Sequence, residues 1–88
     1  MFTSWGVETV RKFTRDELAA ILSKLDGEGY GVVLRAKGIV PCQEGGWLHF
    51  DFTPGEADVR MGAADYTGRL CVIGSKLDEA ALKALFGV

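Results

Sequence analysis

The chain has 88 residues, enough for one domain with one hydrophobic core, so we expect residues 1–88 to form a single domain. Its formal net charge of -2 at pH 7 argues against nucleic acid as a partner, because phosphate binding depends on clustered lysine and arginine. The apolar runs are too short to span a bilayer and the first ten residues do not resemble a signal peptide, so we expect no membrane partner and a cytoplasmic location.

The first part of the chain predicts a strand followed by a helix. Residues 2–10 mix aromatic and β-branched side chains, as strands do. Thr14 and Glu17 have the spacing of a capping box, so a helix is predicted to begin after Thr14. Leucine and isoleucine then recur every three or four residues until Gly27, which gives this helix one apolar stripe for packing on a sheet.

A central strand is predicted over residues 31–42, a stretch of strong β propensity that carries two cations. In a regular strand one face would hold Val32, Leu34 and Ala36, and the other face Val33, Arg35 and Lys37. Gly38 is expected to relax the pleat into a bulge. Pro41 should end regular pairing, because proline donates no backbone hydrogen bond.

Three more strands and a helix complete the chain. Residues 47–52 alternate cleanly between two faces, which are formed by Leu48, Phe50 and Phe52 and by Trp47, His49 and Asp51. A shorter strand over residues 57–61 follows the turn at Pro54-Gly55, and residues 69–74 form the last strand. The final helix is expected to begin near Asp78 and to end at Gly87.

This order, β-α-β-β-β-β-α, predicts an α+β fold: a two-layer sandwich of a mainly antiparallel sheet with two helices on one face. The first strand, the first helix and the central strand are expected to form a right-handed crossover unit, and the remaining strands to follow as a meander. The other sheet face would then be uncovered. Six side chains are predicted to gather on that face, namely Arg35, Lys37, Trp47, His49, Asp51 and Arg60.

These six residues have three interpretations. Tryptophan and arginine are enriched in interface cores, which favours a docking surface for another domain or subunit. Alternatively, Trp47 only covers a neighbouring strand while Arg35 and Asp51 pair across it. Aromatic and basic side chains on an open sheet also resemble an RNA-binding platform, an interpretation that the acidic balance of the chain disfavours.

A metal site is a further candidate. His49 and Asp51 lie two positions apart on one strand face, a spacing that can place two ligands near one ion, with Cys42 or Cys71 as a third. A histidine beside a carboxylate is more often paired or solvated, however, and two isolated cysteines favour free thiols. No phosphate-binding loop occurs. We therefore assign no catalytic, cofactor-binding or metal-binding residue.

Three stretches together resemble the C-terminal domain of the CobW-type GTPases, a family of cobalamin-biosynthesis and metal-insertion proteins. They are LRAKGIV at residues 34–40, GGWLHFDF at 45–52 and RLCVIGSKLDEAALKALF at 69–86. The most specific motif is Arg-Ala-Lys-Gly at residues 35–38. The resemblance covers nearly the whole chain.

The resemblance implies a role beside a GTPase. In that family an N-terminal P-loop domain binds GTP and carries a Cys-x-Cys-Cys metal motif, and the C-terminal domain packs against it and helps to recognise targets or to couple nucleotide state to metal transfer. Neither motif occurs in these 88 residues, so no catalytic residue and no GTP hydrolysis carry over. GTP and a divalent metal are implied only for a full-length family member.

We therefore expect a non-enzymatic accessory domain, excised from a longer GTPase or encoded alone, that acts in cobalamin or metal-cofactor biosynthesis. Its partner would be a GTPase domain, in cis or in trans, or a metalloprotein client. The alternative is a small stand-alone metal- or ligand-binding module that uses His49, Asp51 and a cysteine.

Overall fold

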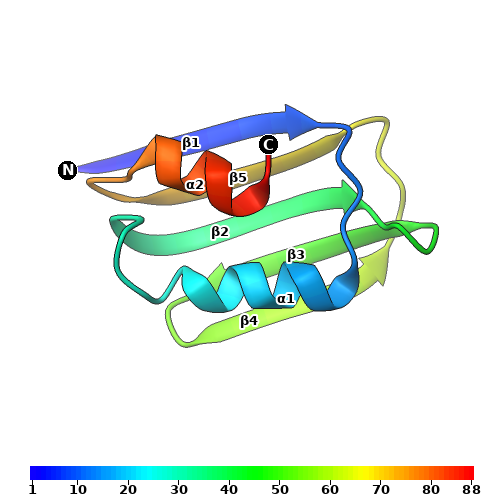
Figure 1. Ribbon diagram of the computed structural model, residues 1–88, viewed down its shortest axis with the longest axis horizontal. Coiled ribbons are helices and arrows are strands. Elements are labelled where there is room, and N and C mark those ends of the chain that lie inside the picture. Colours follow the sequence, from blue (N-terminus) through cyan, green and yellow to red (C-terminus); the bar gives the residue numbers. More distant parts are fainter.

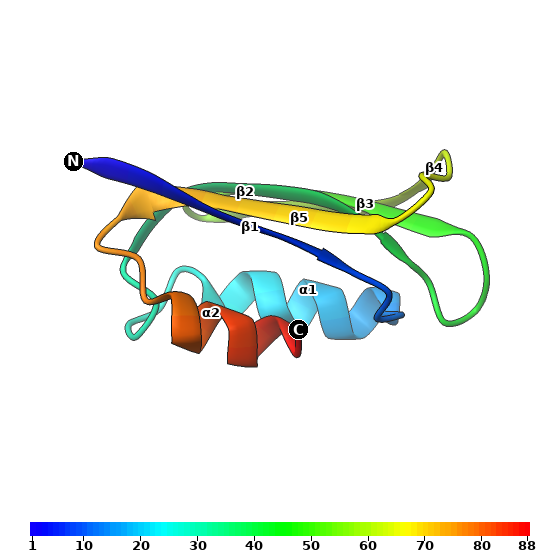
Figure 2. The same cartoon turned by 90° about the horizontal axis from the view of Figure 1, so that it is seen from above.

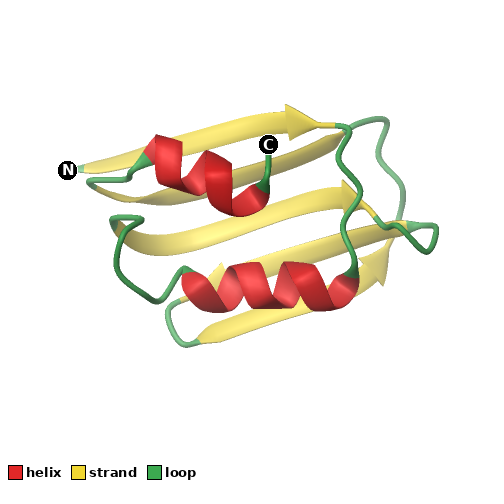
Figure 3. Ribbon diagram, viewed as in Figure 1, coloured by secondary structure: helices red, strands yellow, loops and turns green.

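The structure, a computed structural model, describes residues 1–88. Its elements follow the predicted order: β1 (Phe2–Thr9), α1 (Arg15–Lys24), β2 (Val32–Pro41), β3 (Trp47–Thr53), β4 (Glu56–Gly62), β5 (Gly68–Ser75) and α2 (Glu79–Phe86). The strands form one antiparallel sheet, and both helices cover the same face of it (Figures 1, 2 and 3). The predicted α+β fold is confirmed. Neither helix is long and apolar enough to cross a membrane.

The order of the strands across the sheet is β1-β5-β2-β3-β4. β2, β3 and β4 form a meander as predicted, but the prediction is wrong for β5, which returns to pair with both β1 and β2. β1 and β2 are therefore parallel strands with β5 between them. The physical reason is burial, because β5 carries alternating buried side chains and suits the sheet interior, whereas the mostly exposed β4 suits an edge.

The two faces of β2 differ from the prediction at its first residues. The ladder between β2 and β5 shifts between Val33 and Arg35, so the bulge lies at Leu34. Val33 is consequently in the core at 5% exposure, whereas Val32 is 59% exposed. Gly38, where a bulge was expected, keeps regular register on both sides, and a Cβ there would lie 2.5 Å from Cε2 of Phe50. Glycine is therefore required at position 38 because the backbone packs closely against this ring, and not because of a bulge.

The hydrophobic core lies between the sheet and the helices. Its largest fully buried side chains are Phe13, Phe50, Phe52 and Phe86. The rings of Phe50 on β3 and Phe86 on α2 stack with their centroids 6.2 Å apart, which holds α2 against the sheet. α1 contributes the predicted stripe of Leu18, Ile21 and Leu22.

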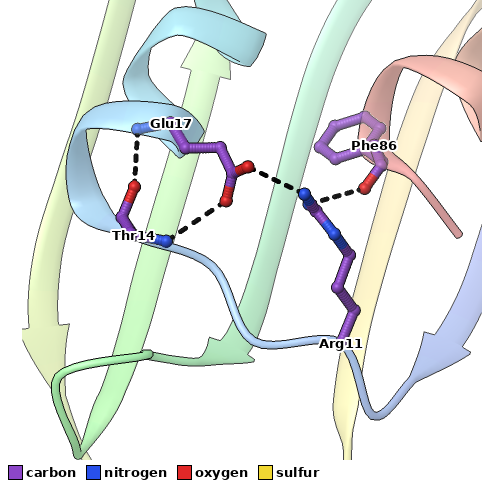
Figure 4. A network of polar contacts seen from close by, with 4 residues as sticks. All are labelled: Arg11, Thr14, Glu17 and Phe86. Atoms are coloured by element: carbon purple, nitrogen blue, oxygen red, sulfur yellow. Dashed lines mark hydrogen bonds and ion pairs between the residues drawn. The ribbon is translucent and has the colours of Figure 1, made fainter.

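A polar network joins the beginning of α1 to the end of α2 (Figure 4). Thr14 and Glu17 form the predicted capping box, in which the Thr14 hydroxyl accepts from the Glu17 amide at 3.1 Å. Glu17 Oε2 also accepts from Arg11 Nη2 at 2.8 Å, and Arg11 Nη1 donates to the Phe86 carbonyl at 2.8 Å. Arg11 thus satisfies a free carbonyl at the C-terminus of α2 while it neutralises the capping carboxylate of α1.

Candidate functional site

The sheet surface opposite the helices, here called the open face, is covered by no other element (Figure 2). All six predicted residues lie on it, because buried and outward positions alternate along β3 and the register pairs Lys37 of β2 and Arg60 of β4 with outward residues of β3. Arg35 and Lys37 come from β2, and Arg60 comes from β4. Trp47, His49 and Asp51 come from β3. β5 adds Arg69, Cys71 and Ile73.

An ion network crosses β2, β3 and β4 on this face. The register places Asp51 directly opposite Asp58, an arrangement in which two carboxylates repel. Arg60 Nη1 lies between them, 2.6 Å from Asp58 Oδ2 and 3.0 Å from Asp51 Oδ2. The hydrogen bonds to Asp58 and then to Asp51 raise the pKa of Arg60 above its ordinary value. Arg35 Nη2 is 3.9 Å from the other Asp51 oxygen, so the predicted pair of Arg35 and Asp51 is present but long.

Beside this network the open face is hollowed. The hollow has a volume of about 490 Å³, and its floor includes Gly38, Phe50 and Leu70. Its remaining lining residues are Lys37, Ile39, His49, Asp51, Arg60, Asp65, Arg69 and Cys71. The volume is that of a site for one or a few side chains or a small polar ligand.

The charges around the hollow are paired with one exception. Asp51 is occupied by Arg60 and Arg35, and Asp65 is held by Arg69, whose Nε lies 3.1 Å from Asp65 Oδ2. Lys37, which is opposite Asp51 in the register, forms no ion pair. The ammonium of Lys37 is therefore the group that is free to meet an anionic side chain of a partner.

His49 connects the open face to the loop between β4 and β5. Its Nε2 lies 2.8 Å from the Ala63 carbonyl, so Nε2 carries a proton and donates this hydrogen bond. The ring packs closely on Gly62, where a Cβ would lie 2.5 Å from His49 Cδ2. His49 therefore fixes the loop that carries Asp65, and Nε2 is not free to bind a metal.

His49, Asp51 and Cys71 of the alternative metal site line the same hollow but do not come together as a set of metal ligands. Cys42 is buried and Cys71 lies on the open face, and both thiols are free. β2 separates Cys71 on β5 from His49 and Asp51 on β3. No group of three or more histidine, cysteine, aspartate and glutamate side chains in the structure could hold a metal ion.

The structure therefore divides the six predicted residues. Arg35, Asp51 and Arg60 share the ion network, and Lys37 and His49 line the hollow. Trp47 is half-buried at the first position of β3, paired with Pro41 and Gly62, and does not line the hollow. The sequence reasoning missed Asp65 and Arg69, and it considered Cys71 only as a third metal ligand and not as part of the open face. Alternation of Arg69 and Cys71 with the apolar Leu70 and Val72 was the available signal for the latter two.

Comparison with known proteins gives matches of two kinds, one family and two solved structures. The family described as "Cobalamin synthesis protein cobW C-terminal domain" matches residues 2–88. The fold is similar to that of the Zn(II)-bound YjiA GTPase from E. coli, with a TM-score of 0.79 and 20% sequence identity over 98% of this chain and 29% of that chain. A Zn(II)-bound triple mutant of the YjiA GTPase matches with the same values. No curated protein matches the sequence.

Proposed function

Because the chain belongs to the family of cobalamin synthesis protein cobW C-terminal domains, we propose that it is a non-enzymatic accessory domain that docks on another protein through its open face. The partner would be a GTPase domain or a metalloprotein client, in the cytoplasm and in cobalamin or metal-cofactor biosynthesis. The chain spans less than a third of the length of the GTPases whose fold it shares. These 88 residues hold no P-loop motif, so GTP and a divalent metal would be bound by the GTPase domain.

The observation that carries this proposal is the open face itself. One side of the sheet packs on two helices, and the other side presents an ion network, an unpaired lysine and a half-buried tryptophan to solvent. Arginine and tryptophan are the residues that most often dominate binding energy when a partner excludes water from them. The fixed positions of Asp51 and Arg60 lower the entropy that would be lost on docking.

The test is a calorimetric titration of the chain with the GTPase domain of a CobW-type protein from the same genome. Arg35→Ala and Trp47→Ala are each expected to raise the Kd at least about fivefold, the effect of losing an interface anchor. The matched control is Lys24→Ala, which removes an exposed cation from the last turn of α1 on the helix side. This control should leave the Kd unchanged.

Two results would contradict the proposal, each in a different way. Equal affinities for the wild-type chain and both open-face variants would show that the partner docks elsewhere. The accessory role itself would be contradicted if the chain did not bind the GTPase domain, in its GDP state or with a non-hydrolysable GTP analogue, and did not bind the metalloprotein clients of the CobW-type protein.

A further inference from the structure

The two edge strands of the sheet, β4 and β1, differ in how well their side chains protect them from pairing with another strand. At the β4 edge, Arg15 of α1 donates from Nη2 to the Val59 carbonyl at 2.9 Å. Asp58 and Arg60 on the same strand add charges, which discourage pairing with another strand. One edge of the sheet is thus blocked by side chains from this chain.

The β1 edge has none of these protections. β1 runs for eight residues without proline, lysine or a bulge, and its register with β5 is unbroken from Phe2 to Thr9. Glu8 is its single charged residue. Figure 1 shows β1 at the outer side of the sheet with no element beyond it. Exposed backbone groups on a long, regular edge are a template for another strand.

We propose that a second copy of this chain occupies the β1 edge, with the two β1 strands antiparallel about a two-fold axis at Gly6. The two five-stranded sheets would then form one continuous sheet. This inference is independent of the proposed docking function, because it uses the edge of the sheet and not the open face.

The side chains of β1 select this register. With Gly6 opposite Gly6 of the second copy, the pairs on the helix side are Trp5 with Val7 and Thr3 with Thr9. An aromatic residue against a β-branched one, and threonine against threonine, are favourable cross-strand neighbours. On the open-face side Ser4 meets Glu8, where the hydroxyl can donate to the carboxylate.

The ends of the strand support the same register. Phe2 is 70% exposed and Val10 is 90% exposed, which makes them two of the most exposed large apolar side chains of the molecule. The register with Gly6 at the axis places Phe2 opposite Val10 of the second copy, and this contact occurs twice by symmetry. The two exposed apolar residues would therefore cover one another.

Neighbouring registers that keep the two faces aligned are poorer. A shift that puts Trp5 at the axis places Phe2 opposite Glu8 and leaves Val10 without a partner. A shift that puts Val7 at the axis leaves Phe2 unpaired and places Gly6 opposite Glu8. Of the three registers, only the one at Gly6 pairs Phe2 and Val10 with an apolar side chain.

One strand pair buries less surface than a standard stable interface, so the dimer should be weak and dependent on concentration. The test is sedimentation equilibrium of the 88-residue chain from micromolar to millimolar concentration. Ser4→Glu puts a second carboxylate opposite Glu8 of the other copy, twice by symmetry, and should raise the dimer Kd about tenfold. Ser4→Lys puts an ammonium there and should lower the Kd by about the same factor.

Ser4 is exposed and pairs with Ile73 in the monomer, so neither variant should disturb the fold, which thermal unfolding at low concentration checks. Ala20→Glu and Ala20→Lys make the same charge changes on the exposed surface of α1 and should leave the Kd unchanged. A chain that is monomeric at millimolar concentration would overturn the proposal. A dimer whose Kd is the same in Ser4→Glu and Ser4→Lys would also overturn it. So would a dimer whose Kd changes as much in the Ala20 variants as in the Ser4 variants.

Discussion

At the scale of single residues, the ion network on the open face depends on one guanidinium. Asp51 and Asp58 lie opposite one another on neighbouring strands, and Arg60 hydrogen-bonds both carboxylates. The side chain of Arg60 is about half exposed, so solvent screens these interactions. The effect of Arg60 should therefore be clearest as a dependence on salt.

We expect Arg60→Gln to lower the Tm at neutral pH, because the two facing carboxylates lose their shared counter-ion. The pKa of Arg60 is raised in the fold, so its contribution is complete below the ordinary arginine value and disappears only as the pH rises through the raised value, far into alkali. The Tm difference should therefore be constant between pH 6 and 9. It should shrink as the salt concentration rises, because salt screens charges that are exposed to solvent.

Thermal unfolding monitored by circular dichroism at several pH values between 6 and 9 and at several salt concentrations measures this difference. Arg15→Gln, which removes a cation that has no carboxylate partner, is the control, and its Tm difference should not shrink with salt in this way. A Tm difference that stays the same at high salt would mean that Arg60 acts through packing of its stem and not through charge.

At the scale of elements, Arg11 joins the two helices, which do not follow one another in sequence. Its guanidinium donates to Glu17 in α1 and to the carbonyl of Phe86 in α2, and it lies 4.1 Å from the centroid of the Phe13 ring. These bonds lie partly out of water, where a charge-assisted hydrogen bond is worth more than on an open surface. The helix layer is thus held together by a polar contact as well as by the core.

A double-mutant cycle measures this contact. Arg11→Met keeps much of the apolar stem and removes the donors, and we expect a loss of about 1–2 kcal/mol in the free energy of unfolding. Glu17→Ala should cost a similar amount, because it also removes half of the capping box. The coupling energy between the two should be about 0.5–1 kcal/mol from urea unfolding. Additive losses would mean that the pair in Figure 4 contributes nothing of its own.

Local signals in the sequence identify the elements and their ends. Thr14 with Glu17 marks the beginning of α1, and Gly87, in the left-handed conformation, marks the end of α2. The bulge at Leu34 was not predicted, because it arises from the pairing of β2 with β5. β5 lies about forty residues further along the chain, so no local signal marks the bulge. The sequence around Val32 and Val33 reads equally well in either register, and only the partner strand decides which valine is buried.

At the scale of the whole molecule, the position of β5 explains both what was predicted of the site and what was missed. Alternation along β2, β3 and β4 suffices to place the six predicted residues on one face, whatever the order of the strands. The neighbours of Lys37 depend on that order. With β5 assigned to the end of a meander, Cys71 beside Lys37 and Arg69 beside Ile39 could not be anticipated.

The central position of β5 leads to a last prediction about stability. Val72 of β5 is fully buried, with Trp5 of β1 on one side and Ala36 of β2 on the other. Val59 of the edge strand β4 also faces the helices but is only half-buried, and it has a neighbouring strand on one side alone. Because both residues are valines, the same substitution at both positions shows how the free energy of unfolding depends on the position in the sheet.

Val72→Ala should lower the free energy of unfolding by about 2–3 kcal/mol, since the lost methyl groups leave a cavity that neighbours on three sides hold open. Val59→Ala should cost less than about 1 kcal/mol, because solvent already reaches the side chain and β4 can move to fill the space. Urea unfolding with a common slope for both variants measures the two losses. Equal losses would contradict a sheet in which β5 lies between β1 and β2, because that order alone makes Val72 an interior position on both sides.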